Sequence, residues 1–251
     1  YEKGEGSQAD YAQASRYYAQ ACENGLALGY GELARLYRQG RGVLRIPQRA
    51  VELNEQACDE GVFESCRQLG EMLEVGEGDE RDRIRAMSLF RTACDGGNFK
   101  ACTQLARLYE IQENYEWAAS LYQRACEGSE SDACERLGYI YELGEGRGRD
   151  PQRAVDYFDR ACDLYQLSSC IHLGDVLLTG DGIVQDEKNA VRLYNFACDQ
   201  GDMEGCVKVA EMFLVGRGIT QDINNARTFF QLACSKNYAR GCEGLTFLRK
   251  K

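Results

Sequence analysis

Thirteen cysteines are the residues whose chemistry and spacing stand out in this chain of 251 residues. Eight residues of continuous helix would hold two Cα atoms about 12 Å apart, which is too far for a disulfide. A turn containing Gly or Asp interrupts the doublets, however, as in 59–61, 95–97 and 199–201. We therefore predict disulfides within the doublets, the alternative being that cysteine only fills small packing positions. Twelve cysteines form doublets whose members are eight positions apart: Cys58 and Cys66, Cys94 and Cys102, Cys126 and Cys134, Cys162 and Cys170, Cys198 and Cys206, and Cys234 and Cys242.

The remaining cysteine, Cys22, has Tyr30 at the position where its partner would stand. We predict that Cys22 is a buried free thiol, with a reactive thiol or an intermolecular bridge as the alternatives. Six disulfides would point to an oxidising compartment, such as the periplasm, the cell exterior or a comparable organelle space.

The doublets follow an internal repeat. The first cysteine recurs in steps of 36, 36, 32, 36, 36 and 36 residues, starting from Cys22. A period of this length is typical of a solenoid of helix pairs. We predict an all-α single solenoid over 1–251, with units that end near 22, 58, 94, 126, 162, 198 and 234 and a C-terminal capping helix over 239–251. The chain is expected to start in mid-repeat, because 1–6 matches 141–146, and to change curvature at its short repeat.

Each repeat is predicted to contain two helices. In one repeat the first helix covers 133–143, and the second begins at Asp150-Pro151 and runs to Cys162. Asp150 is a preferred N-cap residue, and proline suits the first helical position. Equivalent caps are Asp10, Asp82, Asn114, Asp186 and Asp222. Gly-x-Gly pairs recur at 4/6, 40/42, 76/78, 144/146, 180/182 and 216/218. Since no strand precedes them, they indicate left-handed helix ends and turns rather than a phosphate-binding loop.

The repeating unit reads Ala-Cys-x(2)-Leu-Gly-x(2)-Tyr, then Gly-x-Gly, then Ala-x(2)-Tyr/Phe-Phe/Tyr-x(2)-Ala-Cys. This pattern resembles the Sel1-like repeat, a relative of the tetratricopeptide repeat, and most of all the Helicobacter-type cysteine-rich proteins. The resemblance implies a right-handed α/α superhelix of about seven helix-pair repeats. It also implies a secreted or periplasmic protein that binds other molecules along a concave groove, with the mitochondrial intermembrane space still open as a location. Penicillin-binding or weak β-lactamase activity is the alternative that the resemblance implies.

Composition and motifs exclude several classes of function. A formal net charge of −10 argues against a nucleic-acid binder, and no apolar stretch approaches the length of a membrane span. With one histidine and neither Cys-x-x-Cys nor His-x-x-x-His, we predict no metal and no cofactor. No Ser-x-x-Lys supports a serine β-lactamase, and nothing in the sequence sets the geometry of a Ser-His-Asp triad built on His172. A thiol- or haem-related assembly factor that uses Cys22 is a further alternative.

The expected function is a protein–protein interaction scaffold. The first helices should build the groove, and positions +2 and +5 after the second cysteine should be exposed, whereas +3, +4 and +7 should pack. Trp117 replaces polar residues of the other repeats, so it is either a binding anchor or filler for the short repeat. The alternative for the whole set is an ordinary solvated face, and His172 is expected to face solvent. The predicted partner-binding residues are Gln104, Arg107, Trp117, Arg136, Tyr139, His172 and Asp175.

The predicted partner is another protein or a peptide. Glu74, Glu110 and Glu142 recur in register and would suit basic segments of such a partner, although a solvated helix face also explains them. The sequence leaves the oligomeric state open.

Overall fold

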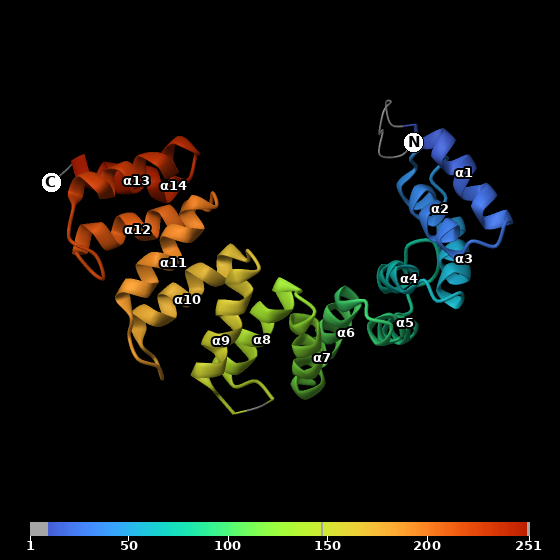
Figure 1. The fold of residues 1–251 in the computed structure, drawn as a ribbon, viewed down its shortest axis with the longest axis horizontal. Coiled ribbons are helices and arrows are strands. Elements are labelled where there is room, and N and C mark those ends of the chain that lie inside the picture. The colour runs from blue at the N-terminus through green and yellow to red at the C-terminus, as the bar shows by residue number, and fades with distance from the viewer. Residues whose placement is uncertain (1–9, 147, 250–251) are drawn as a thin grey trace. The chain divides into compact units, whose positions relative to one another are not determined.

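The computed structural model describes residues 10–146 and 148–249, and these form fourteen α-helices and no strand (Figure 1). The all-α helix-pair fold is therefore confirmed. Within these residues no helix is long and apolar enough to cross a membrane. The helices are α1 (Tyr11–Glu23), α2 (Ala27–Gln39), α3 (Pro47–Asp59), α4 (Phe63–Val75), α5 (Arg83–Asp95), α6 (Phe99–Ile111), α7 (Tyr115–Glu127), α8 (Ser131–Leu143), α9 (Pro151–Asp163), α10 (Leu167–Thr179), α11 (Glu187–Asp199), α12 (Met203–Val215), α13 (Ile223–Ser235) and α14 (Ala239–Arg249).

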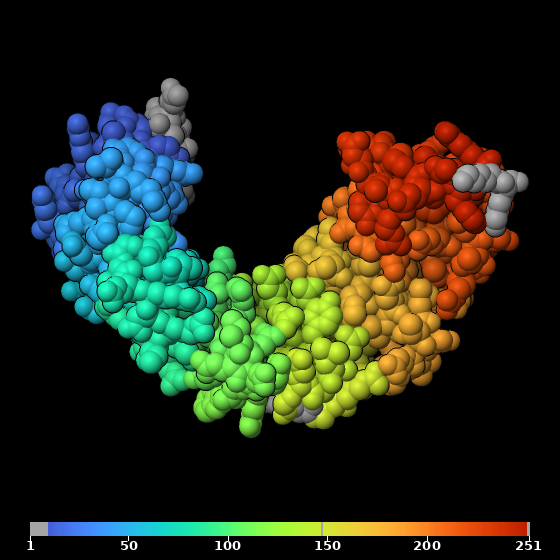
Figure 2. Space-filling view, turned by 180° about the vertical axis from the view of Figure 1, so that it is seen from behind, coloured from blue at the N-terminus to red at the C-terminus, as the bar shows by residue number. Residues whose placement is uncertain are grey.

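The helices divide into two compact units. The first unit extends to Gln112 and contains α1–α6, and the second begins at Glu113 and contains α7–α14. We call the even-numbered helices first helices and the odd-numbered ones second helices. Inside each unit, helices that follow one another in the chain also pack together, so the surface colours change in chain order (Figure 2). A single solenoid over 1–251, its superhelical sense and a change of curvature at the short repeat stay predictions.

Six disulfides each join a second helix to the first helix that follows it. The Cα atoms of each pair lie 4.6–4.8 Å apart across the intervening turn. The predicted disulfides are thus confirmed in all six doublets, and they indicate an oxidising compartment. The bonded pairs are Cys58 with Cys66, Cys94 with Cys102, Cys126 with Cys134, Cys162 with Cys170, Cys198 with Cys206, and Cys234 with Cys242.

In five of the six pairs the second cysteine is the more deeply buried member. Cys102, Cys134 and Cys170, for example, are completely buried in the first turns of α6, α8 and α10. In the last pair both Cys234 and Cys242 are only partly buried. The alternative that cysteine merely fills small packing positions is therefore wrong, because each of these sulfurs is bonded as well as packed.

The first hairpin, α1–α2, is held differently. Tyr30 stands in the second-cysteine position, and its hydroxyl donates a hydrogen bond to the carbonyl oxygen of Cys22 at 3.1 Å. Cys22 forms no disulfide, and it is half-buried where a buried free thiol was expected. This burial raises the pKa of the Cys22 thiol, because it disfavours the thiolate. A hydrogen bond therefore replaces the covalent link in this hairpin.

The expected N-caps are confirmed. All six side chains accept a hydrogen bond from the backbone N–H three residues further on, as Asp150 does from Arg153 at 3.1 Å. Such a cap satisfies one of the backbone donors that the first helical turn leaves without an intrahelical partner.

The two glycines of each Gly-x-Gly pair have different tasks. The first glycine ends a first helix in the left-handed conformation, as predicted, at Gly40, Gly76, Gly144, Gly180 and Gly216. The second glycine lets the loop after a first helix pack closely on the first residues of the preceding second helix. At Gly218 the N–H donates to a carboxylate oxygen of Glu187 at 3.1 Å, and a Cβ atom would collide with the Glu187 backbone. Gly4 and Gly6 lie outside the described residues.

Aromatic rings on the second helices pack over small residues of the first helices. The Phe158 ring lies where a Cβ on Gly138 would be, and Tyr194 covers Gly174 in the same way. Leu137, Gly138 and Tyr141 are buried, so the expected packing positions are confirmed. In the short repeat, only residues 112–114 link α6 to α7, whereas residues 144–150 link α8 to α9, so the tighter turn is also confirmed.

Removal of one disulfide should destabilise the chain by roughly 2–3 kcal/mol, since a closed loop of about nine residues restricts the unfolded chain. We expect this loss for the double variant Cys198→Ala/Cys206→Ala in urea denaturation under non-reducing conditions. Cys22→Ala is the matched control and should change stability far less. Equal losses in the two proteins would contradict a stabilising role of the disulfide.

The second glycine of a pair should tolerate alanine poorly. Gly201 and Gly218 both have positive φ, but a Cβ meets nothing within 4 Å at Gly201 and collides with α11 at Gly218. Gly201→Ala should therefore cost only the backbone strain of about 1–2 kcal/mol. Gly218→Ala should cost clearly more, as measured by chemical denaturation, and an equal cost would refute the proposed close contact.

Candidate functional site

Side chains at positions +2, +5 and +8 of the first helices form the candidate site. Positions are counted from the second cysteine of a doublet, or from Tyr30 in the first repeat. Residues three apart lie near one another on a helix, so these positions share one face. We call this face the first-helix surface and describe it separately in each unit.

In the second unit the first-helix surface carries an aromatic cluster. The Tyr139 ring contacts the rings of Phe158 and His172, each with centroids 5.0 Å apart. The His172 and Phe158 centroids are 4.6 Å apart, and the Arg136 guanidinium lies 5.8 Å from the Tyr139 centroid. Burial and the carboxylates of nearby glutamates raise the pKa of the Tyr139 hydroxyl. The cluster thus combines flat ring faces with a cation.

The expectation that His172 faces solvent is wrong. Its Nε2 atom lies 2.9 and 3.1 Å from the two carboxylate oxygens of Glu142, and its side chain is 30% exposed. Glu142 is at position +8 of α8, and His172 is at position +2 of α10. The pair therefore connects two consecutive first helices. Glu142 is already engaged in this contact, so it is not an open member of an acidic ladder.

Asp175 makes a similar connection between the next two first helices, α10 and α12. Its Oδ1 atom accepts hydrogen bonds from the Tyr194 hydroxyl at 2.6 Å and from Lys208 Nζ at 2.7 Å. Burial and the adjacent carboxylate raise the pKa of Tyr194 above its usual range. Arg240 then continues the series, since it contacts Glu204 and Glu211 of α12 at 3.1 Å.

The predicted partner-binding residues therefore fall into separate groups. Arg136, Tyr139 and His172 form one cluster, and Asp175 lies one turn along α10 from His172. Gln104 and Arg107 lie on α6 in the first unit, where Arg107 donates to Gln104 at 3.4 Å. The Trp117 side chain is 58% exposed near the start of α7, which disfavours its interpretation as filler. Most of the +2 and +5 side chains are half-buried rather than exposed, because they contact the neighbouring repeat.

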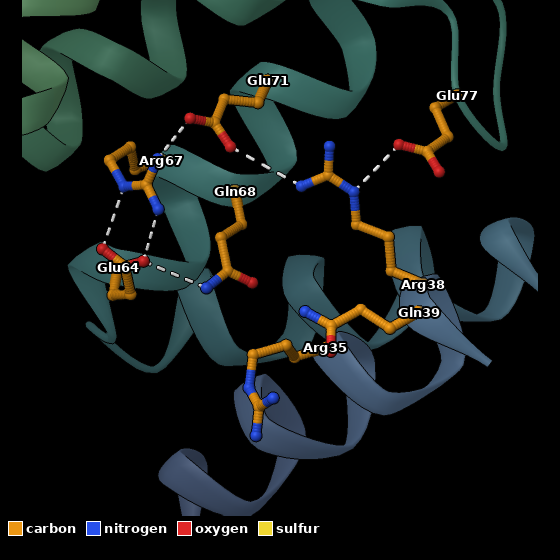
Figure 3. Close-up of a pocket in the computed structure, with 8 residues that line it drawn as sticks. All are labelled: Arg35, Arg38, Gln39, Glu64, Arg67, Gln68, Glu71 and Glu77. Carbon is orange, nitrogen blue, oxygen red and sulfur yellow. Dashed lines mark hydrogen bonds and ion pairs between the residues drawn. The ribbon is translucent and has the colours of Figure 1, made fainter. Parts of the chain in front are cut away.

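In the first unit the first-helix surface contains a hollow of about 450 Å³ (Figure 3). Its lining residues come from α2, α4 and the turn after α4, and all of them are polar or charged. The lining residues are Arg35, Arg38, Gln39, Glu64, Arg67, Gln68, Glu71 and Glu77.

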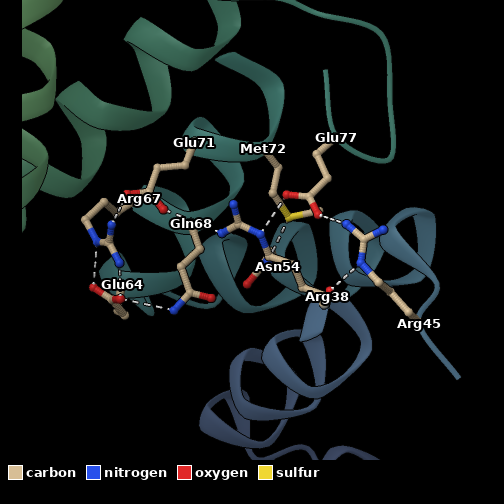
Figure 4. Close-up of polar contacts among 9 residues, drawn as sticks. All are labelled: Arg38, Arg45, Asn54, Glu64, Arg67, Gln68, Glu71, Met72 and Glu77. Atoms are coloured by element: carbon tan, nitrogen blue, oxygen red, sulfur yellow. Dashed lines mark hydrogen bonds and ion pairs between the residues drawn. The ribbon is translucent and has the colours of Figure 1, made fainter. Parts of the chain in front are cut away.

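Opposite charges alternate along one side of this hollow (Figure 4). Arg67 pairs with both Glu64 and Glu71. Arg38 lies 3.5 Å from Glu71 and 2.9 Å from Glu77, so it joins the two glutamates. The guanidinium and carboxylate groups therefore hold one another in place, which gives the hollow a fixed hydrogen-bonding surface.

Glu64 shows how strongly this network acts. Although partial burial raises the pKa of the carboxyl group, hydrogen bonds from Arg67, Gln68 and Asn98 lower it to about 2. Each of these donors favours the carboxylate over the neutral acid. Glu64 therefore remains an anion through the whole neutral and mildly acidic range.

Asn54 lies beneath the ion-pair network (Figure 4). It is fully buried, its Nδ2 atom is 3.7 Å from the sulfur of Met72, and its Oδ1 atom has no hydrogen-bond partner in the described part of the chain. Other repeats have an aromatic residue here, such as Phe90 or Phe158. A buried acceptor without a partner is destabilising, so this core position is less favourable than its counterparts.

Most residues of the hollow are absent from the predicted partner-binding set, because that set lies in the middle repeats. The register itself contained the signal: Arg35 and Arg38 are at +5 and +8 from Tyr30, and Gln68 and Glu71 are at +2 and +5 from Cys66. Arg67 and Glu77 lie outside these positions, and only their contacts connect them to the site. In the described ranges no group of three or more His, Cys, Asp or Glu side chains is placed to hold a metal ion.

Antiparallel helix pairs, disulfides between successive pairs and a polar face on the first helices define a disulfide-bonded helical repeat protein. The Sel1 repeat family model matches residues 1–26, 27–62, 63–98, 100–129, 131–165, 167–202 and 204–238. The chain therefore belongs to the Sel1 repeat family, as its sequence pattern predicted.

Two solved structures with TM-scores well above 0.5 agree with this assignment. One is a protective antigen present in uropathogenic Escherichia coli strains, which displays an SLR fold. Its sequence is 26% identical and its TM-score is 0.77, and the match covers 99% of this chain and 54% of the antigen. This chain thus spans about half the length of that relative. A Sel1 repeat protein from Oxalobacter formigenes is 25% identical with a TM-score of 0.69, covering 84% and 88%. Cysteine rich protein B of Helicobacter pylori is 25% identical over 52% of this chain and 95% of that one, with a TM-score of 0.42. No curated protein matches the sequence.

Arg67→Gln should raise the pKa of Glu64 from about 2 towards its ordinary value near 4.5, because two hydrogen bonds to the carboxylate are lost. The wild-type contacts of Glu64 stabilise the fold above about pH 4.5, and this stabilisation should disappear as the pH falls towards 2. Carboxyl carbon NMR titration measures the change. Arg49→Gln, whose guanidinium pairs with Glu52, is the control and should leave Glu64 unchanged. A wild-type Glu64 that titrates near pH 4.5 would contradict the assignment.

Proposed function

We propose that this chain is a protein-interaction scaffold, secreted or periplasmic, that binds a segment of another protein along its first-helix surface. The aromatic cluster of Arg136, Tyr139 and His172 is the observation that carries the proposal. Tyrosine and arginine dominate the energetic centres of protein interfaces, since each offers a large contact area together with hydrogen-bonding groups.

The cluster is held in position before any partner arrives. His172 is fixed by Glu142, and Tyr139 is fixed by Phe158 beneath it. Side chains that are already ordered lose little conformational entropy on binding, so more of the contact energy contributes to affinity. The fixed positions of these side chains favour a binding role over a flexible solvated face.

The hollow of the first unit is a second candidate surface, and its chemistry is different. Within the alternating network, Glu64, Glu71 and Glu77 are matched by Arg38, Arg45 and Arg67. A surface of internally paired charges offers both donors and acceptors and has no strong preference for a partner of one sign. We infer that it binds a polar segment through hydrogen bonds, and that basic segments are not required.

Affinity capture from native extract with matched variants tests the proposal. Arg136→Ala and Tyr139→Ala should each reduce recovery of the same partner at least tenfold, because each removes a large side chain from the first-helix surface; Trp117→Ala should do the same if the partner also contacts the exposed start of α7. Val184→Ala is the control, as Val184 is 88% exposed in a loop and lies outside the first-helix surface. Thermal melts establish that each variant is folded. Equal recovery of every captured protein by all four variants would refute the binding site.

A further inference from the structure

The turn between α9 and α10 carries an exposed aromatic residue in a strained backbone conformation. Tyr165 has a φ of 64° and is 67% exposed. Left-handed backbone is unfavourable for a bulky L residue, because its Cβ crowds the following carbonyl oxygen. In the described chain this position is left-handed in all seven turns that join a second helix to the next first helix, and glycine adopts that conformation most easily. The residues in the other six turns are Gly25, Gly61, Gly97, Ser129, Gly201 and Asn237.

The core does not require a large side chain at this position. A Cβ atom at Gly25, Gly61, Gly97 or Gly201 would have no neighbour within 4 Å, so the position faces open space. A strained and exposed tyrosine therefore costs stability without filling the core. Strained residues of this kind are concentrated where a protein contacts ligands, so Tyr165 is a candidate for such a contact.

Two further apolar residues adjoin Tyr165. The Phe196 ring of α11 lies with its centroid 5.9 Å from that of Tyr165, and Phe196 and Leu164 are both half-buried. We call Leu164, Tyr165 and Phe196 the turn patch. In the other repeats, the position of Leu164 holds a polar residue or glycine. The position of Phe196 holds Leu232 in α13 and polar residues in the remaining second helices, which are Gln20, Gln56, Thr92, Arg124 and Arg160.

Acidic side chains border the turn patch. Asp163 lies two residues before Tyr165, and Asp199 lies three residues after the phenylalanine, on the same side of α11. Both aspartates are exposed. Asp159 lies one helical turn before Asp163, and partial burial together with the Asp163 carboxylate raises the pKa of Asp159. The carboxylates are thus close enough to disfavour one another's charge, and a cation between them would relieve this repulsion.

The cations of the neighbouring helices leave this negative charge only partly balanced. Arg192 of α11 lies near Asp159 and lowers its pKa. Arg160 of α9 is directed to the preceding repeat, where it donates to the carbonyl oxygen of Glu127 at 3.3 Å. Three carboxylates and one guanidinium therefore border the patch, so its surroundings favour a positively charged ligand group.

We propose that the turn patch binds an arginine-bearing segment of a partner protein. A guanidinium is planar and weakly hydrated, so it packs on aromatic rings while its N–H groups pair with carboxylates. The rings of Tyr165 and Phe196 supply the apolar surface, and Asp163 and Asp199 supply the opposite charge. A lysine meets the same charge, but its compact ammonium group contacts the rings less. The patch shares no residue with the first-helix surface, so the proposal stands independently of the function proposed above.

Fluorescence anisotropy with the full disulfide-bonded chain tests the proposal. The probe is a fluorescein-labelled octapeptide of alternating glycine and arginine, and the comparison peptide has lysine in place of arginine. At physiological ionic strength the arginine peptide should bind saturably and at least fivefold more tightly than the lysine peptide. Tyr165→Gly and Phe196→Thr should each weaken its binding at least fivefold, and Tyr165→Phe should restore what the glycine variant loses. Val184→Ala, in an exposed loop outside the patch, is the matched control.

Urea denaturation distinguishes a binding residue from a structural one. Because glycine relieves the left-handed strain, Tyr165→Gly should unfold at a urea concentration no lower than the wild type, although it loses the peptide. Tyr165→Asn is a second variant and should behave in the same way, since Asn237 occupies the equivalent position.

Three results would overturn the proposal. The first is equal affinity of the wild type and both Tyr165 variants, Tyr165→Gly and Tyr165→Asn, for the arginine peptide. The second is equal affinity of the wild type for the arginine and lysine peptides, or no saturable binding of either, because charge alone would then explain any contact. The third is clearly earlier unfolding of both variants, which would assign Tyr165 to the fold rather than to a ligand.

Discussion

The contact between consecutive helix hairpins is the interaction on which the rest of this protein depends. A single hairpin cannot bury its apolar face, so each repeat is stable only when it packs against the next. Here the junction is fixed at both ends. At one end, a disulfide joins a second helix to the first helix that follows it and holds the Cα atoms of its two cysteines 4.6–4.8 Å apart. At the opposite end, a Gly-x-Gly turn packs on the preceding second helix. With both ends fixed, neighbouring repeats within a unit have little freedom to slide or rotate.

This fixed junction explains why the polar face of the first helices is ordered. In three cases a +8 or +5 side chain of one first helix contacts a +2 or +5 side chain of the next first helix. Glu142 therefore meets His172, Asp175 meets Lys208, and Arg38 meets Glu71. The backbone register repeats, while the residue types that occupy it differ, so one scaffold presents different chemistry at each junction.

The two units carry different residue types on their first-helix surfaces. The first unit has an ionic hollow in which guanidinium and carboxylate groups alternate, and the second has an aromatic cluster with one arginine. Each unit therefore selects its own kind of ligand group: the ionic hollow selects polar groups, and the cluster selects apolar or aromatic groups. This difference gives specificity at each surface, because a ligand of the wrong kind leaves desolvated groups without contacts.

Spacing alone was sufficient to predict the repeat, its helix pairs, the caps and the disulfides. These features depend on local rules: Asp150 caps a helix through its own neighbours, and Cys198 and Cys206 are joined across one short turn. Burial at +3, +4 and +7 followed from helical periodicity for the same reason. The second glycine of each pair was only partly understood from sequence, since its close contact is made with a helix about 30 residues away.

Only the tertiary structure decided which side chains meet. His172 reads as a solvent-facing residue in sequence, because the carboxylate that holds it is 30 residues away in the preceding repeat. The ionic hollow was missed for the same reason, as its ion pairs join α2 to α4 and to the turn after α4. The sequence determined the scaffold because helices, caps and short turns depend on nearby residues. The binding surface depends on pairs from neighbouring repeats, and their distances are set by packing.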